Sequence, residues 1–331
     1  MTTACIIPPA VLPIEWFEGR TFHHQRFGDL RILAQAKESQ GVSVSVCIPA
    51  LNEEATIGNI VGAIRKVLMR RHGLVDELVV IDSSSTDRTA RAAEKAGATV
   101  IQDRDVLPDL EPLSGKGEAM WKSLFVTRGD VVAWLDADIQ EFHPRFVYGV
   151  LGPILTDPGI GFVKAFYERP LQNQGKVSEA GGGRVTELMA RPVINMFWPY
   201  LAPVIQPLSG ECAGRRALLE QVPFFTGYGV DLGMLIDVGE RFGLEAMAQV
   251  DLDRRIHRNR TLGELSRMSY AIFQVAVRRL TSSGRLALSS GPSPGLYQFE
   301  RGPAGTRMEP ALIDVRERPP AITIAGYGAA R

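Results

Sequence analysis

The chain has 331 residues, and its 37 lysines and arginines balance 37 aspartates and glutamates, so the formal net charge is zero. This balance argues against a general nucleic-acid-binding or membrane-surface protein. The apolar fraction of 45% and the charged fraction of 22% are typical of a globular protein with a large core. Three cysteines without metal-ligand spacing, no apolar run of about 20 residues and no leader-like start predict a cytoplasmic protein without a membrane partner.

Hydrophobic patterning predicts strands that alternate with helices from residue 42 onward. Residues 1–41 form an amino-terminal extension with one short helix around 28–40. Strands are expected at 42–50, 76–82, 98–102 and 130–136, and helices at 53–68, 88–97 and 117–129. This alternation is typical of an α/β fold with a doubly wound, mostly parallel sheet.

The second half of the chain has a less regular pattern. It predicts strands at 161–170 and 244–252, a glycine-rich turn entering a helix at 181–197, a turn and helix at 207–223, and a helix at 227–243. A long amphipathic helix follows at 261–284, with Thr261 and Glu264 spaced as a capping box. From residue 291 the chain is rich in proline and glycine, which predicts an extended tail.

Polar residues gather where three of the expected strands end, at 52–54, 82–85 and 136–138. Carboxyl ends of parallel strands meet at one edge of a sheet, where ligands bind. Asp136 and Asp138 form an Asp-x-Asp pair, which suits a divalent cation on a diphosphate. Such a pair is also common at solvated strand ends, so the shared edge is the stronger indication of a site.

Four further segments have both a functional and a structural interpretation. Asn52–Glu54 either caps a helix or contacts a base or ribose. Lys116, between two glycines before a helix, suits a phosphate cradle, although the spacing of a P-loop is missing. Arg184 and Thr186 follow three glycines and either bind an anion or belong to a flexible loop. The cationic run 254–260 is either a solvated surface or a site where His257 binds metal and its neighbours bind phosphate.

These segments occur in the order found in glucosyl- and mannosyl-3-phosphoglycerate synthases: IPALNEE, DSSSTD, GKGEAMW, DAD, GGGRVTE, PLSGE, GYGVD and HRNR. The chain resembles this family from about residue 42 to residue 260 and into the long helix that follows. The first stretches are general to enzymes with the GT-A fold, whereas GGGRVTE together with HRNR is much more specific. The resemblance implies a GT-A fold and a retaining, metal-dependent glycosyltransferase.

The resemblance also implies a division of the chain and a set of site residues. Residues 42–140 would bind the nucleotide sugar, 141–260 the acceptor, and 261–331 would form a carboxyl-terminal helix and tail. The implied nucleotide-sugar ligands are Pro49, Ala50, Leu51, Glu53, Ser83, Lys116, Asp136, Leu208 and Ser209. Those for the acceptor, 3-phosphoglycerate, are Gly183, Arg184, Thr186, Tyr228 and Asn259. Asp138 and His257 would bind Mg²⁺ or Mn²⁺, and Asp231 and Lys116 would act in catalysis.

The donor and the mechanism are less closely specified. Asp231 and Cys212 stand where glucosyl members of the family have Glu and Tyr, so the resemblance favours GDP-mannose while UDP- or GDP-glucose stays an alternative. For retention, the acceptor hydroxyl would attack from the side of the leaving group, with a diphosphate oxygen as the base. No residue stands out as a covalent nucleophile, although Asp231 stays a candidate.

Two other classes of protein stay open as alternatives. A membrane-associated GT-A enzyme would use a polyprenyl phosphate acceptor, but the sequence lacks an apolar anchor. A non-catalytic binding protein would bind nucleotide sugars without turnover, and the Asp138–His257 pair argues against it. A homodimer is the expected assembly.

Overall fold

The computed structural model describes residues 13–173, 176–178, 183–256, 260–303 and 305–328. In this part of the chain, the centre is an eight-stranded sheet with the order β1-β11-β6-β9-β5-β2-β3-β4. Only β9 runs antiparallel to its neighbours, β5 and β6. The strands are β1 (Thr21–His23), β2 (Val44–Ala50), β3 (Glu77–Asp82), β4 (Thr99–Gln102), β5 (Val131–Trp134), β6 (Phe162–Glu168), β9 (Cys212–Arg215) and β11 (Met247–Arg254).

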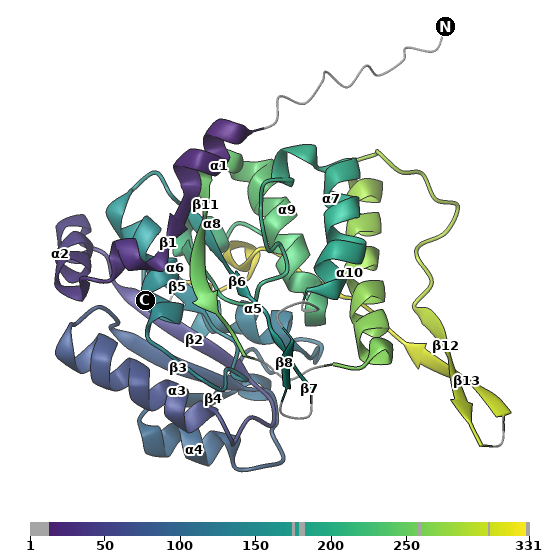
Figure 1. Cartoon of the computed structure of the whole chain (residues 1–331), viewed down its shortest axis with the longest axis horizontal. Coiled ribbons are helices and arrows are strands. Elements are labelled where there is room, and N and C mark those ends of the chain that lie inside the picture. Colours follow the sequence, from purple (N-terminus) through teal and green to yellow (C-terminus); the bar gives the residue numbers. More distant parts are fainter. Residues whose placement is uncertain (1–12, 174–175, 179–182, 257–259, 304, 329–331) are drawn as a thin grey trace, which may run out of the picture.

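Helices cover both faces of this sheet (Figure 1). One face packs against α2 (Leu30–Gln40), α3 (Ile57–Ala63) with its π-helical continuation Ile64–Arg71, α4 (Thr89–Ala96) and α6 (Arg145–Thr156). The other face packs against α5 (Lys116–Val126), α7 (Arg191–Phe197), α8 (Arg216–Leu219), α9 (Val230–Phe242) and α10 (Leu262–Ser282). A short helix, α1 (Ile14–Arg20), precedes β1.

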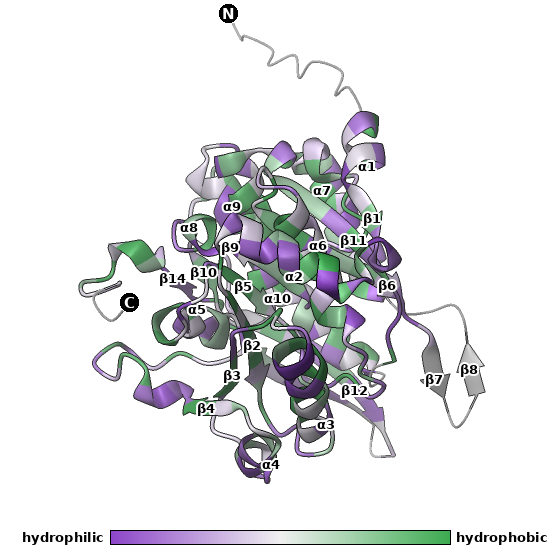
Figure 2. Cartoon of the chain, turned by 90° about the vertical axis from the view of Figure 1, so that its left-hand side faces the viewer, coloured by the Kyte–Doolittle hydropathy of each residue, from purple (hydrophilic) through white to green (hydrophobic). Residues whose placement is uncertain are grey.

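Alternation along each strand divides the core into two layers. Val46 and Ile48 of β2 belong to the apolar cluster under α3 and α6, whereas Cys47 between them belongs to the cluster under α5 and α9. Successive side chains of a strand point to opposite faces, so a strand covered on both sides has to be apolar throughout. Figure 2 shows the hydrophobic strands β2, β3 and β5 enclosed in this way.

Most of the expected elements of the first half are confirmed. The helix expected from residue 53 begins at Ile57, and its predicted inner residues Ile57, Ile60 and Ile64 are fully buried. Gly97 ends α4 in the left-handed conformation, with φ of 101°, which glycine adopts without a steric penalty. Strand β5 ends at Trp134, so the two aspartates that follow it lie in the loop at the sheet edge.

Two strands of the central sheet were not expected from the sequence. Residues 207–223, expected as a turn and helix, contain the strand β9, which enters the sheet between β5 and β6, and the expected helix is the four-residue α8 that follows it. A strand of four residues is too short for a periodic pattern of apolar side chains to be recognised in the sequence. The amino-terminal extension also contributes β1 to the sheet edge, where it pairs with β11. The long helix α10 begins with the predicted Thr261–Glu264 capping box.

The carboxyl-terminal tail is extended, as expected, but it forms defined pairs. Strands β12 (Gly295–Gly302) and β13 (Gly305–Leu312) form a hairpin that projects from the body (Figure 1). The tail then returns, and β14 (Glu317–Arg318) pairs with β10 (Phe224–Phe225). A third pair joins β7 (Leu171–Asn173) to β8 (Lys176–Ser178). Among the described residues, no helix is long and apolar enough to cross a bilayer.

Candidate active site

A cavity of about 460 Å³ lies where β2, β3 and β5 end, and the residues after Gly183, α9 and α10 form its other walls. This is the edge of the sheet at which the sequence predicts a site. The predicted site residues that line it are Pro49, Ala50, Leu51, Glu53, Ser83, Lys116, Asp136, Asp138, Gly183, Arg184, Thr186, Leu208, Tyr228 and Asp231. Ser209 is fully buried and is not part of the lining. His257 and Asn259 lie outside the described residues.

The loops after β2 and β3 are tied directly to each other. Asn52 has a left-handed backbone, with φ of 57°, and its side-chain oxygen accepts a bond of 2.8 Å from the Thr86 N–H. The Glu53 N–H donates to the Thr89 hydroxyl at 2.7 Å. Asn52 therefore joins two loops and does not cap α3, whose N-cap residue is Thr56. These bonds hold the rim that the sequence assigns to the base and ribose.

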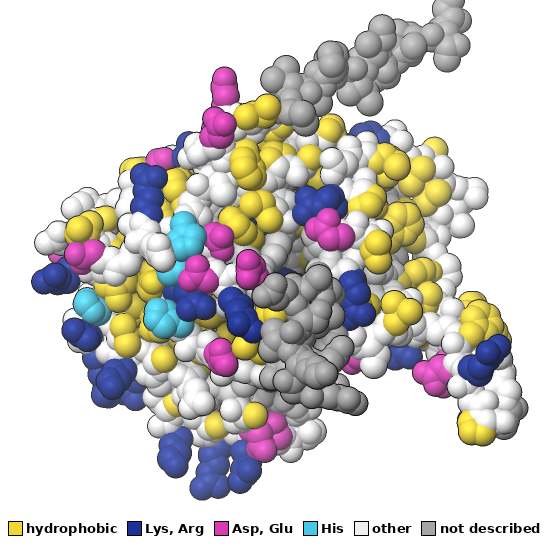
Figure 3. All heavy atoms as spheres, viewed as in Figure 1, with side chains coloured by type: hydrophobic (Ala, Val, Ile, Leu, Met, Phe, Trp, Pro, Cys, Tyr) yellow, Lys and Arg dark blue, Asp and Glu magenta, His cyan; other side chains and the backbone are white. Residues whose placement is uncertain are grey.

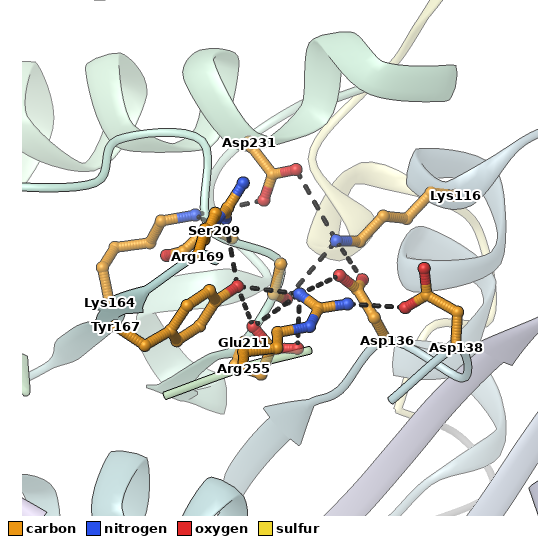
Figure 4. Close-up of polar contacts among 11 residues, drawn as sticks. Lys116, Asp136, Asp138, Lys164, Tyr167, Arg169, Ser209, Glu211, Asp231 and Arg255 are labelled. Carbon is orange, nitrogen blue, oxygen red and sulfur yellow. Dashed lines mark hydrogen bonds and ion pairs between the residues drawn. The ribbon is translucent and has the colours of Figure 1, made fainter. Parts of the chain in front are cut away.

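The Asp-x-Asp pair is held by two cations (Figure 4). Asp136 accepts from Lys116 Nζ at 2.7 Å and from Arg255 at 2.9 Å. The same guanidinium donates to Asp138 at 2.5 Å, so Arg255 bridges the two aspartates. The repulsion expected between neighbouring carboxylates is thus relieved by basic side chains of the chain itself.

Charge pairing in this cluster opposes the effect of burial. Burial alone would raise the pKa of Asp136, but Lys116 and Arg255 outweigh it and hold the pKa well below the usual range. Burial would likewise lower the pKa of Lys116, but Asp136 and Asp231 raise it. Both groups therefore stay charged at neutral pH, and the cavity keeps a fixed ammonium beside a fixed carboxylate.

A fully buried carboxyl group supports Arg255 from behind. Glu211 lies 3.0 Å from the guanidinium and accepts from the Tyr167 hydroxyl at 2.6 Å. The Arg255 guanidinium also donates to the Tyr167 oxygen at 2.7 Å, and Arg169 donates to it at 3.0 Å. Burial raises the pKa of Glu211, against the opposing effect of Arg255. The network fixes the position of Arg255 between the aspartates.

Asp231, at the start of α9, faces the cavity between two lysines. Its carboxylate accepts from Lys164 at 3.1 Å and lies 3.6 Å from Lys116 Nζ. Lys164 is 2% exposed and also donates to the Ser209 carbonyl at 2.6 Å. Ser209 thus takes part through its backbone, behind the cavity wall.

Away from the strand ends, the cavity lining contains the arginines Arg184 and Arg260. Arg184 is half-buried and donates to the Arg260 carbonyl at 3.1 Å. Arg260 in turn donates to the Tyr228 hydroxyl at 2.8 Å and its guanidinium stacks over the Tyr228 ring. The predicted acceptor residues Arg184 and Tyr228 are therefore linked through Arg260, and the two arginines present cationic groups to the cavity.

Sequence reasoning missed Arg255, Glu211, Tyr167 and Lys164. Arg255 belongs to the run 254–260, whose charges are equally typical of a solvated surface. A register shift in β11 between Asp251 and Arg254 precedes Arg255, which is buried. Lys164 lies in a strand that otherwise looks apolar, and a charged residue that interrupts such a strand is a signal that points to a buried partner.

The cavity has the donor atoms that a hard divalent cation requires. Asp138 and Glu53 place carboxylate groups in its wall, and Mg²⁺ and Mn²⁺ prefer oxygen ligands of this kind. Asp136 is already paired with Lys116 and Arg255, whereas Arg255 is the one group in the described part of the chain that bonds to Asp138. A guanidinium at Asp138 shows that this position attracts a cation.

Comparison with known proteins identifies the family. The model of glycosyl transferase family 2 matches residues 45–221. A glucosyl-3-phosphoglycerate synthase of Petrotoga mobilis is 46% identical over 308 residues, which cover 93% of this chain and 95% of the relative. The protein of the same name from Mycolicibacterium smegmatis is 45% identical over 284 residues, 86% of this chain and 90% of the relative.

Two solved structures agree with these relatives. The mannosyl-3-phosphoglycerate synthase of Rubrobacter xylanophilus superposes with a TM-score of 0.86 at 41% identity and covers 95% of this chain and 99% of that one. The glucosyl-3-phosphoglycerate synthase of Mycobacterium tuberculosis with Mn²⁺, UDP-glucose and phosphoglyceric acid has a TM-score of 0.79 at 42% identity and covers 92% and 98%. The chain therefore belongs to glycosyl transferase family 2 and, within it, to the glucosyl- and mannosyl-3-phosphoglycerate synthases, which are glycosyltransferases with the GT-A fold.

Proposed function

We propose that the chain transfers a hexosyl group from a nucleoside diphosphate sugar to 3-phosphoglycerate, with retention of configuration and with a divalent cation. The observation that carries the proposal is the division of one cavity. Carboxylates from the strand ends form one part of the lining, Arg184 and Arg260 from later segments form another part, and Asp231 lies in the same lining. A donor diphosphate with its metal suits the first part, and a small phosphorylated acid suits the second.

The residues of the strand ends are assigned to the nucleotide. Pro49, Ala50, Leu51, Glu53 and Ser83 form the rim around the base and ribose. Lys116 and Asp136 position the diphosphate, and Leu208 lines the sugar pocket. Ser209 supports that pocket from behind through Lys164. Gly183, Arg184, Thr186, Tyr228 and Asn259 are assigned to the acceptor.

Asp138 and His257 are assigned to Mg²⁺ or Mn²⁺. Support comes from the position of Asp138 in the cavity wall and from solved relatives that contain Mn²⁺ or Mg²⁺ together with UDP. When bound, the cation neutralises charge on the diphosphate leaving group. Arg255 contacts Asp138 at 2.5 Å, so a cation has to displace it or share the carboxylate with it.

The charged side chains of the cavity fit a mechanism without a covalent intermediate. Asp231 is bound to Lys164 at 3.1 Å and lies 3.6 Å from Lys116, and this double pairing weakens it as a nucleophile. It is better suited to orient sugar hydroxyls. Lys116 and Arg255 face the place where negative charge develops, and prepositioned charges of this kind stabilise a transition state. The acceptor hydroxyl attacks from the leaving-group side, where a diphosphate oxygen takes its proton.

The hexose is glucose or mannose, and relatives support both. Sequence resemblance favours GDP-mannose, and the mannosyl-3-phosphoglycerate synthase of Rubrobacter xylanophilus has a TM-score of 0.86. Glucosyl transfer is supported by the names of the Petrotoga mobilis and Mycolicibacterium smegmatis relatives, which are 46% and 45% identical. We rank a glucosyl donor first, because these two relatives are more similar in sequence to this chain than the mannosyl enzyme, which is 41% identical.

A crossed donor and acceptor panel tests the proposal. UDP-glucose, GDP-glucose and GDP-mannose are each incubated with 3-phosphoglycerate, with glycerate or without acceptor, and nucleotide release and product anomeric configuration are measured. Release should require 3-phosphoglycerate and a divalent cation, and Asp138→Ala should lower turnover more than tenfold. Asp105→Ala, which changes an exposed carboxylate outside the cavity lining, is the control. Turnover in the presence of chelator, or equal use of glycerate, would contradict the proposal.

We also propose a cytoplasmic homodimer. The described cysteines Cys47 and Cys212 are free and buried, which suits a reducing compartment. The projecting β12–β13 hairpin exposes the large apolar side chains Tyr297, Phe299, Met308 and Leu312. A second copy of the chain is the partner that we assign to this surface.

A further inference from the structure

Two histidines and an aspartate meet at the edge of the central sheet, outside the cavity lining. His23 Nε2 lies 2.9 Å from Asp253 Oδ1, and His24 Nε2 lies 2.6 Å from Asp253 Oδ2. One ligand atom from each residue falls within 4.8 Å of the others. Figure 3 shows histidine side chains gathered beside carboxylates on this face of the molecule. None of the three residues is among those assigned to the nucleotide, to the acceptor or to the metal at Asp138.

The fold brings these residues together from distant parts of the sequence. Strand β1 runs parallel to β11, and His23 is in register with Asp251. The register of β11 then shifts, and Asp253 has a left-handed backbone with φ of 63°. Arg145 fixes this irregular segment by donating to the Leu252 carbonyl at 2.8 Å. The Asp253 carboxylate is thereby turned toward both imidazoles.

We propose that His23, His24 and Asp253 bind a divalent transition metal, with Zn²⁺ as the best-suited ion. Two imidazole nitrogens and one carboxylate oxygen are ligands that Zn²⁺ prefers, and water can complete a tetrahedral shell. His24 is only 7% exposed, so its ring is already held in place. The His23 and Asp253 side chains are 42% and 43% exposed, which gives an ion access from solvent.

The surroundings of His24 match those of a metal ligand. Its second nitrogen, Nδ1, lies 3.1 Å from the Tyr148 hydroxyl. Ligating histidines usually bond through their other nitrogen to such a group, which fixes the ring and the tautomer. A metal at Nε2 requires the proton on Nδ1, and the Tyr148 oxygen can accept it.

His23 has to give up one weak contact on metal binding. Its Nδ1 accepts from the Gln25 N–H at 3.3 Å. With a metal at Nε2 the proton moves to Nδ1, and this long bond is lost. Without metal, the same three residues form a hydrogen-bonded link between β1 and β11, which is the competing interpretation.

A metal at this position would fasten the irregular end of β11 to the amino-terminal segment. Asp253 precedes Arg255 by two positions, and Arg255 bridges Asp136 and Asp138. The ion would therefore hold the strand end from which Arg255 enters the cavity. Its place is structural, since the cluster is not part of the cavity lining.

Calorimetric titration of the metal-free, full-length chain with ZnCl₂, without nucleotide, tests the inference. A single Zn²⁺ per chain is expected, and Co²⁺ in its place should give the visible absorption of a tetrahedral site. His23→Ala and Tyr148→Phe should each weaken Zn²⁺ binding about tenfold or more. His72→Ala, which alters a histidine outside the cluster, should leave it unchanged.

The outcomes separate this site from the proposed active-site metal. Asp138→Ala should keep the Zn²⁺ stoichiometry and the Co²⁺ spectrum while it lowers transferase turnover. Thermal unfolding should shift upward with Zn²⁺ in the parent chain and in Asp138→Ala, but not in His23→Ala. If the parent chain binds no Zn²⁺, or if His23→Ala and His72→Ala bind it equally well, the three residues are only a hydrogen-bonded link.

Discussion

Arg184 is the side chain on which recognition of the acceptor is expected to depend most. Its guanidinium lines the cavity and is oriented by the Arg260 carbonyl at 3.1 Å. A planar guanidinium can bind phosphate or carboxylate with two parallel hydrogen bonds, which an ammonium group cannot reproduce. Each charge-assisted bond contributes about 1.5–3 kcal/mol.

We therefore predict that Arg184→Lys raises the KM for 3-phosphoglycerate by about 10- to 100-fold, since about 1.4 kcal/mol corresponds to a factor of ten. The affinity for the nucleotide sugar should change little. Steady-state kinetics and calorimetry of the donor measure the two effects separately. Arg191→Lys is the matched control, because this arginine lies in the same helical segment but pairs with Glu187 outside the cavity. Loss of donor affinity in Arg184→Lys would refute the assignment.

Glu53 gives the cavity a group that titrates near neutral pH. Burial, followed by repulsion from Asp138, Asp87 and Asp136, raises its pKa from 4.5 to about 7. Between these two values the unfolded chain has lost the Glu53 proton while the folded chain keeps it. Folding is therefore favoured by low pH, and the contribution is lost as the pH rises through the folded pKa.

We predict that Glu53→Gln flattens the pH dependence of stability. In the presence of chelator, the urea concentration at the midpoint of unfolding of the parent chain should decrease as the pH rises from 4.5 to about 7. This decrease should be smaller in the variant. Glu54→Gln, which alters a neighbouring carboxylate paired with Arg88, is the control. Parallel curves for the parent chain and Glu53→Gln would show that Glu53 is ionised in the fold throughout this range.

The same residues show where sequence reasoning ends. The cavity residues next to a strand end or a glycine turn were predictable, because such positions bring side chains to one edge of a parallel sheet. Arg255 and Glu211 were not, because their pairing depends on the register shift of β11 and on β9 lying beside β5. These long-range contacts leave no periodic signal in the sequence.

At the scale of elements, the returning tail is a structural part of the active-site scaffold. Strand β14 pairs with β10, and the Arg318 guanidinium forms two bonds of 2.8 Å with Glu118 in α5. Glu118 is fully buried, and α5 begins with Lys116 of the cavity. The tail was expected to be extended, but composition alone gave no indication of what it would pair with.

We predict that Arg318→Ala lowers stability by about 3–5 kcal/mol, because it leaves the Glu118 carboxylate buried without its main partner. Arg316→Ala is the control, since this arginine pairs with Glu111 on the surface, where such pairs contribute at most about 1 kcal/mol. The midpoints of urea unfolding of the two variants measure the difference. Equal losses would mean that β14 is held by its backbone and not by the buried ion pair.

At the scale of the whole molecule, the β12–β13 hairpin exposes large apolar side chains on one of its faces. Its register places Tyr297 opposite Pro310 and Phe299 opposite Met308. Side chains of paired residues lie on the same face, so Tyr297, Phe299 and Met308 form an apolar patch on one face while Glu300 and Arg307 lie on the other. The polar face contacts the start of α10, where Arg267 donates to Gln298 at 2.7 Å.

An isolated two-stranded hairpin is marginally stable in water, and an apolar face of this kind is typical of an interface. We predict that the chain is a dimer through this face and that Phe299→Asp, which changes a side chain that is 70% exposed, converts it to a monomer. The control is Glu300→Gln on the opposite face, which should remain dimeric. Sedimentation equilibrium at several concentrations measures the mass of each variant. A parent chain that sediments as a monomer would refute the assembly, and a dimeric Phe299→Asp would move the interface elsewhere.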